Sequence, residues 1–243
     1  MPIALNRACK LTGWFMKKNK EYVGIFKVHK QVSEEELKEE MKKFVGKIKQ
    51  MPPVKSRVKR QERVREVYSW DLLEYDKEKK EVLFSCEVEA GTYVRKMISE
   101  LGLKIGGSHM LELRRVKAGI FSESDSSFIN LYELEKIRDN EEKLKEIIIP
   151  AEIISRILPS FQLKPQNSSQ KVRNFGSRKS EDFLGNKEKL KQILTGKPLY
   201  KDDVKLNLKE GKNFVLFSGD RFIGVYRKVN EGEIIARAEF VFN

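Results

Sequence analysis

Alternation of apolar and polar residues predicts strands in the first two thirds of the chain. The stretch 20–30 gathers aromatic and β-branched side chains, which favour a pleated surface. Runs 64–75 and 82–89 alternate in the same way and are joined by a polar turn, so they predict a long antiparallel hairpin. The run 109–116 follows a Gly-Gly turn and predicts another strand.

Apolar residues at helical spacing predict helices between these strands. Ser33 and Glu36 form a Ser-x-x-Glu capping box ahead of a stripe that includes Leu37 and Met41, and Gly46 ends this helix. Shorter helices are predicted over 93–101, which Gly102 ends, and over 129–138 and 141–149.

The pattern changes after Pro150. Residues 167–182 are polar and nearly free of branched apolar side chains, which predicts a loop or linker. Beyond it, three apolar runs separated by tight turns predict strands over 214–218, 221–229 and 233–242. The predicted fold class is α+β, with a mixed, largely antiparallel sheet and helices in residues 1–155 and a small, mostly β domain in residues 156–243.

Composition restricts the class of protein. The chain has 243 residues, and 40% of them are apolar, so it can bury a hydrophobic core. Its apolar stretches, such as 147–149, are far shorter than the roughly 20 residues of a membrane-spanning helix. No secretory signal is recognised at its start, so we expect a cytoplasmic protein without a membrane partner.

Cysteine and histidine are rare. Cys9 and Cys86 stand far apart in the sequence, as do His29 and His109, and none of them belongs to a metal-binding motif. This spacing argues against a disulfide framework, a zinc ribbon or a His/Cys metal centre. Carboxylate-bound magnesium stays open at this point.

The net charge of +13 is unevenly distributed. Residues 1–65 carry a net charge of +11, residues 66–155 carry −6 and residues 156–243 carry +8. The densest segment, 47–65, holds eight basic residues and one acidic residue. Such a density attracts phosphate, because each neutralised phosphate releases counterions, so nucleic acid is the expected partner. The alternative interpretation of this segment is a solvated surface without a partner. We adopt that interpretation for the helix 34–47, which carries charges of both signs.

Three motifs, in this order, resemble a known family. Lys20–Gly24 contains a Lys-x-Tyr strand, Gly91–Arg95 reads Gly-Thr-Tyr-Val-Arg, and His109–Gly119 contains Arg-Arg in a strand. Together they resemble the pseudouridine synthases of the TruB/dyskerin type. Segment Lys43–Tyr68 is similar to the basic thumb segment of the archaeal and eukaryotic dyskerin branch, and the tail from Thr195 is similar to a PUA domain, a small RNA-binding β-barrel.

The resemblance implies a partial pseudouridine synthase fold and the isomerisation of uridine to pseudouridine in transfer or ribosomal RNA, without cofactor or metal. It implies that Tyr22 stacks on the flipped-out base and takes part in proton removal. Arg95 is implied to pair with the nucleophilic carboxylate, and Val116 to form an apolar wall of the base pocket. Lys20, Lys59 and Arg60 are candidates for contacts with backbone phosphates.

One part of the family pattern is missing from this sequence. The nucleophilic Asp of the family lies in a Gly-Thr-Leu-Asp-Pro motif, and residues 1–10 match the segment on the C-terminal side of that motif. We therefore expect a chain that binds RNA but is inactive alone, unless a separate N-terminal fragment complements it.

The resemblance also implies partners. These are an H/ACA guide RNA, a small zinc-ribbon protein and a Gly/Arg-rich-type protein that grips the thumb. Two alternatives to the enzyme are a non-catalytic RNA-binding scaffold and a generic basic ribosome-associated protein, although the latter leaves the three motifs unexplained.

Overall fold

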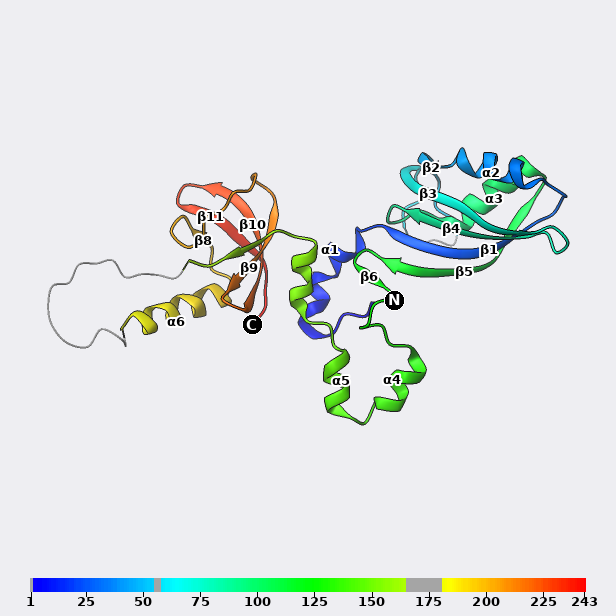
Figure 1. Ribbon diagram of the computed structural model, residues 1–243. Helices are drawn as coiled ribbons and strands as arrows, with labels where there is room; N and C mark the ends of the chain where they lie inside the picture. The colour runs from blue at the N-terminus through cyan, green and yellow to red at the C-terminus, as the bar shows by residue number, and fades with distance from the viewer. Residues whose placement is uncertain (1, 55–57, 165–180) are drawn as a thin grey trace. The chain divides into compact units, whose positions relative to one another are not determined.

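The computed structural model describes residues 2–54, 58–164 and 181–243. The chain divides into two compact units (Figure 1). The first comprises residues 1–3 and 12–147, and the second comprises residues 4–11 and 148–243. The boundary expected after residue 155 stays a prediction. Within the described ranges, no helix is long and apolar enough to cross a membrane.

The first unit is built on a six-stranded antiparallel sheet. Its strand order is β2-β3-β4-β1-β5-β6, so the first strand of the sequence lies near the middle of the sheet. The predicted strand and the predicted hairpin are confirmed as β1 and as β3 with β4. The strands are β1 (Lys20–Val28), β2 (Gly46–Gln50), β3 (Arg63–Asp76), β4 (Glu81–Val88), β5 (Ser108–Ala118) and β6 (Phe121–Ser122).

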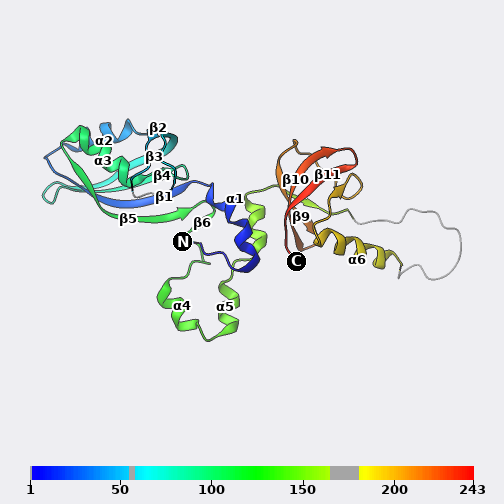
Figure 2. The ribbon, with the colours of Figure 1, turned by 180° about the vertical axis from the view of Figure 1, so that it is seen from behind.

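Two helices cover one face of this sheet, as Figures 1 and 2 both show. In α2 (Glu34–Lys42), the predicted N-cap is confirmed, because the Ser33 side chain accepts a hydrogen bond from the Glu36 amide at 3.1 Å. The second helix is α3 (Val94–Ile105), which packs on β5 and β1. Between the helices and the sheet lies the core, which includes Phe26, Phe84, Trp70 and Leu101.

The predicted end of α3 at Gly102 is wrong. The helix continues to Ile105, and Gly106 ends it in the left-handed conformation with a φ of 82°. Gly102 is needed for a different reason, since a β-carbon there would lie 2.5 Å from the backbone nitrogen of Ser108. It permits the close approach of the helix to the start of β5.

The first unit contains three more short α-helices in its described residues. The two helices predicted before Pro150 are confirmed as α4 (Leu131–Ile137) and α5 (Glu141–Ile147). The sequence pattern did not predict α1 (Thr12–Met16). The predicted end of α2 at Gly46 is wrong, because the helix ends at Lys42 and Lys43 is its C-cap. Gly46 instead opens the edge strand β2 with a φ of 106°.

The second unit is a bent five-stranded sheet with the order β7-β9-β10-β11-β8. Its three long strands confirm the prediction, and β7 pairs with β9 in parallel while the other pairs are antiparallel. The predicted loop 167–182 lies almost wholly outside the described residues. The elements are η1 (Asn6–Leu11), η2 (Ala151–Arg156), β7 (Ser160–Gln162), α6 (Glu181–Leu194), β8 (Leu199–Tyr200), β9 (Asn213–Ser218), β10 (Arg221–Glu231) and β11 (Ile234–Val241).

Each unit has its own apolar core, and that of the second unit includes Phe214, Leu216, Tyr226 and Ile193. The Tyr226 hydroxyl donates to the Ile193 carbonyl at 3.3 Å, which gives this buried phenol a partner. Together the two units confirm the α+β fold class.

Candidate functional site

Tyr22 lies in a row of side chains that crosses four strands. It is opposite Cys86 on β4 and Arg115 on β5, and Cys86 is in turn opposite Trp70 on β3. Directly opposed residues of antiparallel strands point to the same face of a sheet, so the four side chains share one face. Tyr22 is half-buried against the core of the first unit, which identifies this as the face that α2 and α3 cover.

A β-bulge places Val116 beside Tyr22. The register between β1 and β5 changes from Glu21 opposite Lys117 to Tyr22 opposite Arg115, so Val116 is the extra residue. Bulges bend a strand locally, and they often re-aim side chains next to active sites. The structure therefore brings Tyr22 and half-buried Val116 to the same point of the β1–β5 ladder.

Arg95 is the second residue of α3, the helix that packs on β5 and β1. Its side chain is exposed. None of the ion pairs formed within residues 2–54, 58–164 and 181–243 includes Arg95. Its guanidinium is thus available to a carboxylate or phosphate from outside the described residues.

The loop that precedes α3 is held by the end of β2. Gln50, the last residue of β2, donates from its Nε2 to the Tyr93 carbonyl at 3.3 Å and accepts from the Tyr93 amide at 3.0 Å. Sequence reasoning missed Gln50. The signal that could have found it is its place in the alternation of Gly46, Ile48 and Gln50 on the inward face of the strand.

Lys20 is engaged by the backbone of its own unit. Its Nζ donates to the carbonyls of Met16 and Lys18, both at 2.5 Å. Burial, and to a lesser degree the Arg115 charge, lowers the pKa of Lys20. A phosphate at Lys20 would have to compete with these two carbonyls.

Lys59 and Arg60 are exposed on the segment between β2 and β3, close to residues 55–57, which lie outside the described residues. Two more exposed lysines, Lys47 and Lys49, point outward from the edge strand β2. Lys49 pairs loosely with Glu62 at 3.8 Å between its Nζ and the carboxylate. Exposed cations on an edge strand and its loop form a surface that suits a polyanion.

The structure brings the two histidines together, although they are far apart in the sequence. His29 Nε2 and His109 Nδ1 lie 2.8 Å apart, at the ends of β1 and β5 that are distant from Tyr22. In the described parts of the chain, no group of three or more His, Cys, Asp or Glu side chains could hold a metal ion. Cys86 is buried, and burial followed by the nearby Asp71 carboxylate raises the pKa of its thiol to about 12.

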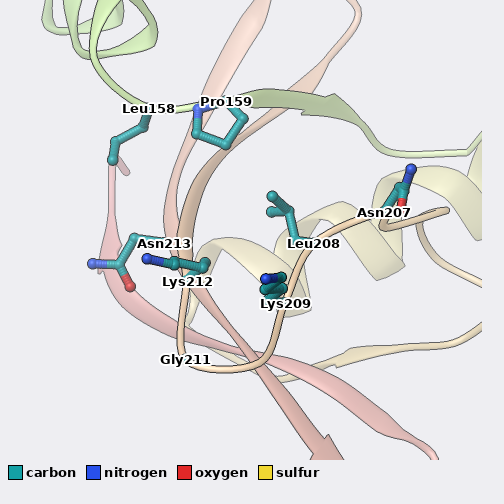
Figure 3. A pocket seen from close by; sticks show the side chains of 8 residues that line it. All are labelled: Leu158, Pro159, Asn207, Leu208, Lys209, Gly211, Lys212 and Asn213. Atoms are coloured by element: carbon teal, nitrogen blue, oxygen red, sulfur yellow. The ribbon is translucent and has the colours of Figure 1, made fainter.

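A separate cleft lies in the second unit and has a volume of about 590 Å³ (Figure 3). Apolar residues line the cleft together with two lysines and two asparagines. None of the six candidate residues lines it. The lining residues are Leu158, Pro159, Asn207, Leu208, Lys209, Gly211, Lys212 and Asn213.

Comparison with protein families assigns most of the first unit. Residues 1–94 match the TruB family pseudouridylate synthase N-terminal domain, and residues 95–155 match the tRNA pseudouridylate synthase B C-terminal domain. Arg95 lies at the junction of the two matches.

Archaeal relatives described as "Probable tRNA pseudouridine synthase B" match the same part of the chain. The Nanoarchaeum equitans relative is 40% identical over 158 residues, which are 63% of this chain and 44% of the relative. The relative from Archaeoglobus fulgidus is 38% identical over 169 residues (68% and 51%), and that from Saccharolobus solfataricus is 37% identical over 171 residues (68% and 67%). The chain thus spans about half the length of the first two relatives.

Solved structures match along the whole chain. A chain from the crystal structure of a Cbf5-Nop10-Gar1 complex is 28% identical with a TM-score of 0.76, and the match covers 100% of this chain and 72% of that one. A chain from an H/ACA RNP bound to a substrate RNA containing 2'-deoxyuridine is 26% identical with a TM-score of 0.73, covering 99% and 71%. The likeness includes the bent sheet of the second unit, which fits the PUA-like barrel expected from the sequence. The chain therefore belongs to the TruB/Cbf5 family of pseudouridine synthases.

Proposed function

We propose that this chain supplies the RNA-binding surface and the base pocket of an enzyme that isomerises uridine to pseudouridine in transfer or ribosomal RNA. The observation that carries the proposal is the position of Arg95. Its guanidinium is exposed in the first turn of the helix that covers the sheet face of Tyr22, and it forms no ion pair with any described residue.

The reaction needs groups of this kind. The bond from C1' of the ribose to N1 of the base breaks, the base turns, and a bond from C1' to C5 forms while C5 loses a proton and N1 gains one. The base must leave the RNA stack to react, and Tyr22 offers it an aromatic face beside the apolar Val116. The phenol of Tyr22 assists the removal of the C5 proton.

Arg95 would orient an ionised carboxylate, which is the nucleophile of the family. This sequence contains no Gly-Thr-Leu-Asp-Pro motif, and in this proposal a separate N-terminal fragment supplies the carboxylate.

RNA binding has three elements in this proposal. Lys59 and Arg60 contact phosphates from the loop between β2 and β3, and Lys20 contributes a weaker contact because two carbonyls already engage it. Residues 156–243 act as a PUA-like RNA-binding domain, and residues 1–155 belong to the catalytic domain. The cleft of the PUA-like domain, which Lys209 and Lys212 line together with apolar residues, suits an RNA strand.

The solved relatives support specific partners. They come from complexes that contain Nop10, Gar1 or a substrate RNA. We therefore propose an H/ACA guide RNA, a small zinc-ribbon protein and a Gly/Arg-rich-type protein as partners of this chain, in the cytoplasm.

The test is a pseudouridine assay on guide-dependent ribosomal RNA and on transfer RNA. The chain alone should bind both RNAs without turnover. Addition of an N-terminal fragment that contains Gly-Thr-Leu-Asp-Pro should produce activity, which Arg95→Ala should abolish. Turnover by the chain alone would contradict the need for an added carboxylate.

The same assay separates the enzyme from a non-catalytic RNA-binding scaffold. A scaffold would bind RNA with unchanged affinity in the Arg95→Ala variant, and no N-terminal fragment would make it active.

A further inference from the structure

The two histidines of the chain, His29 and His109, meet at the surface of the first unit. His29 Nε2 and His109 Nδ1 lie 2.8 Å apart, and the ring centroids are 5.0 Å apart. Both residues are exposed, although 80 positions separate them in the sequence. A solvated ion can therefore reach the two ring nitrogens without any opening of the core.

The pairing of β1 with β5 brings the two rings together. Lys27 lies opposite His109 in this ladder. One step beyond the end of β1, the His29 amide donates to the Gly107 carbonyl at 2.9 Å. Residues two positions apart on an extended chain share a face, so both histidines lie on the face of Lys27. Buried Phe26 points to the other face, which α2 and α3 cover, so the histidines are on the open face of the sheet.

The backbone of Gly107 fixes the place of the His29 ring. A β-carbon at position 107 would lie 2.9 Å from His29 Cγ, so this ring packs directly against the bare backbone. Its Nε2 then faces His109. Because the strand pairing holds the backbone of both histidines, a ligand that needs the two rings together finds them already positioned.

The distance between the two nitrogens is close to what a transition-metal ion requires. An ion about 2.0–2.1 Å from each nitrogen holds them about 2.8–3.0 Å apart at a ligand angle of 90°, and about 3.3–3.4 Å apart at a tetrahedral angle. The rings must therefore turn toward a common point and separate by less than about 0.7 Å. The ion replaces the hydrogen bond, and the hydrogen of the donor ring moves to its other nitrogen or to solvent.

The surroundings leave the two imidazoles as the protein ligands. Among the side chains that the structure describes, no third His, Cys, Asp or Glu completes a group with them, so water fills the other positions around the ion. Two cations lie close by. Lys27 shares the face of the pair, and Lys80 donates from its Nζ to the His29 carbonyl at 3.4 Å. Glu81 lies opposite Lys27 on β4 and offsets part of this charge.

We propose that His29 and His109 form a binding site for one divalent transition-metal ion, Cu²⁺, Ni²⁺ or Zn²⁺, which links the end of β1 to the start of β5. The inference does not depend on the proposed function. An ion that binds the pair only in the folded chain stabilises the first unit. At an ion concentration of 100 times the Kd, the folding equilibrium constant rises about 100-fold.

Calorimetric titration of the full, untagged chain with the chloride salts of the three metals tests the site. The chain carries Cys9→Ser, because the exposed Cys9 thiol is itself a ligand for these metals. One ion should bind per chain, and Cu²⁺ should bind more tightly than Ni²⁺ or Zn²⁺. His29→Ala and His109→Ala should each weaken Ni²⁺ binding by about tenfold or more, and the double variant no further, because one imidazole alone cannot chelate.

His109→Asn separates metal binding from folding. Its side-chain amide can still form a hydrogen bond with His29 Nε2, but it is a poor ligand for Ni²⁺. This variant should keep the metal-free urea midpoint and lose the Ni²⁺ site. In the Cys9→Ser chain, Ni²⁺ should also slow hydrogen exchange of the His29 amide by about tenfold or more, and this response should be absent in His109→Asn.

Lys27→Gln is the matched control, because it changes the charge beside the pair and removes neither imidazole. It should bind Ni²⁺ at least as tightly as the Cys9→Ser chain. Loss of the ion in Lys27→Gln would overturn the assignment to the two imidazoles. Two ions per chain, with one retained at unchanged affinity in each single His→Ala variant, would show independent surface histidines and overturn the shared site. Absence of binding for all three metals would also overturn it.

Discussion

Arg65 lies directly over Gly91, so closely that a β-carbon on Gly91 would lie 3.3 Å from the Nε and Nη2 atoms of the guanidinium. Gly91 also has a φ of 88°, in the region that favours glycine. The Arg65 guanidinium pairs with Glu89 and is only 21% exposed, so it has little room to retreat. Through this contact, the last residue of the basic segment 47–65 packs against the first residue of the Gly-Thr-Tyr-Val-Arg motif.

Gly91→Ala should lower the free energy of unfolding of the first unit by about 1–2 kcal/mol, because alanine adopts a positive φ only with strain and meets the guanidinium. Urea titration followed by tryptophan fluorescence measures this unit, since both tryptophans of the chain, Trp14 and Trp70, belong to it.

Gly46→Ala is the control for backbone strain alone, because Gly46 has a φ of 106° but no atom lies within 4 Å of its added β-carbon. Gly91→Ala should lose less free energy of unfolding when the Arg65 side chain is also removed, because the added β-carbon then no longer meets the guanidinium. Equal losses with and without Arg65 would show that the guanidinium does not matter.

Replacement of Lys59 and Arg60 together by alanine should weaken binding to all RNAs alike and reduce the salt dependence of affinity. Each lost phosphate contact should lower the slope of log K against log salt by about 0.7–0.9. Titrations at several salt concentrations measure this slope. Lys38→Ala is the control, because Lys38 is exposed on α2 and paired with Glu34 at 2.7 Å. An unchanged slope in the double variant would remove these residues from the interface.

Cys86 should resist thiol reagents while exposed Cys9 reacts. Only a thiolate reacts quickly, and burial raises the pKa of Cys86 to about 12, so at about pH 8 Cys86 should be labelled only after unfolding. Mass spectrometry of native and urea-treated chain after alkylation checks this. Fast labelling of both cysteines under native conditions would contradict it.

The same thiol makes the first unit less stable at high pH. An unfolded cysteine loses its proton near pH 9, whereas the folded Cys86 keeps its proton up to about 12. The contribution of Cys86 to stability is therefore fully present below pH 9 and falls as the pH rises toward 12. Between pH 9 and 12, the free energy of unfolding of Cys86→Ala should therefore fall less than that of the unmodified chain. Urea titrations at each pH measure this difference.

Asp203→Ala should destabilise the second unit by about 1–3 kcal/mol, since it leaves the partly buried ammonium of Lys189 without its counterion. Asp203 is 2% exposed, pairs with Lys189 and accepts from the Tyr200 amide at 2.9 Å. Hydrogen exchange of the amides in β8 measures the effect. Asp202→Ala, at the exposed neighbouring position, should leave exchange nearly unchanged. Similar exchange in the two variants would contradict a role of the ion pair.

Local patterns predicted most of the elements around the candidate site. Alternation of side chains identified β1, β3, β4 and β5, and the Ser33 side chain caps α2 as expected. These elements depend on contacts between residues that are close in the chain, so the sequence alone carries them. Tyr22 and Arg95 were singled out in another way, by the resemblance of their motifs to those of a family.

The tertiary structure decided what those residues face. Alternation assigns Tyr22 to one side of a strand, but only strand pairing places it opposite Cys86 and Arg115, and only the bulge places Val116 beside it. The bonds from Gln50 to Tyr93 and the meeting of the two histidines likewise join residues tens of positions apart. Register and helix packing depend on the cooperative burial of the whole core, and no local run of residues contains that information.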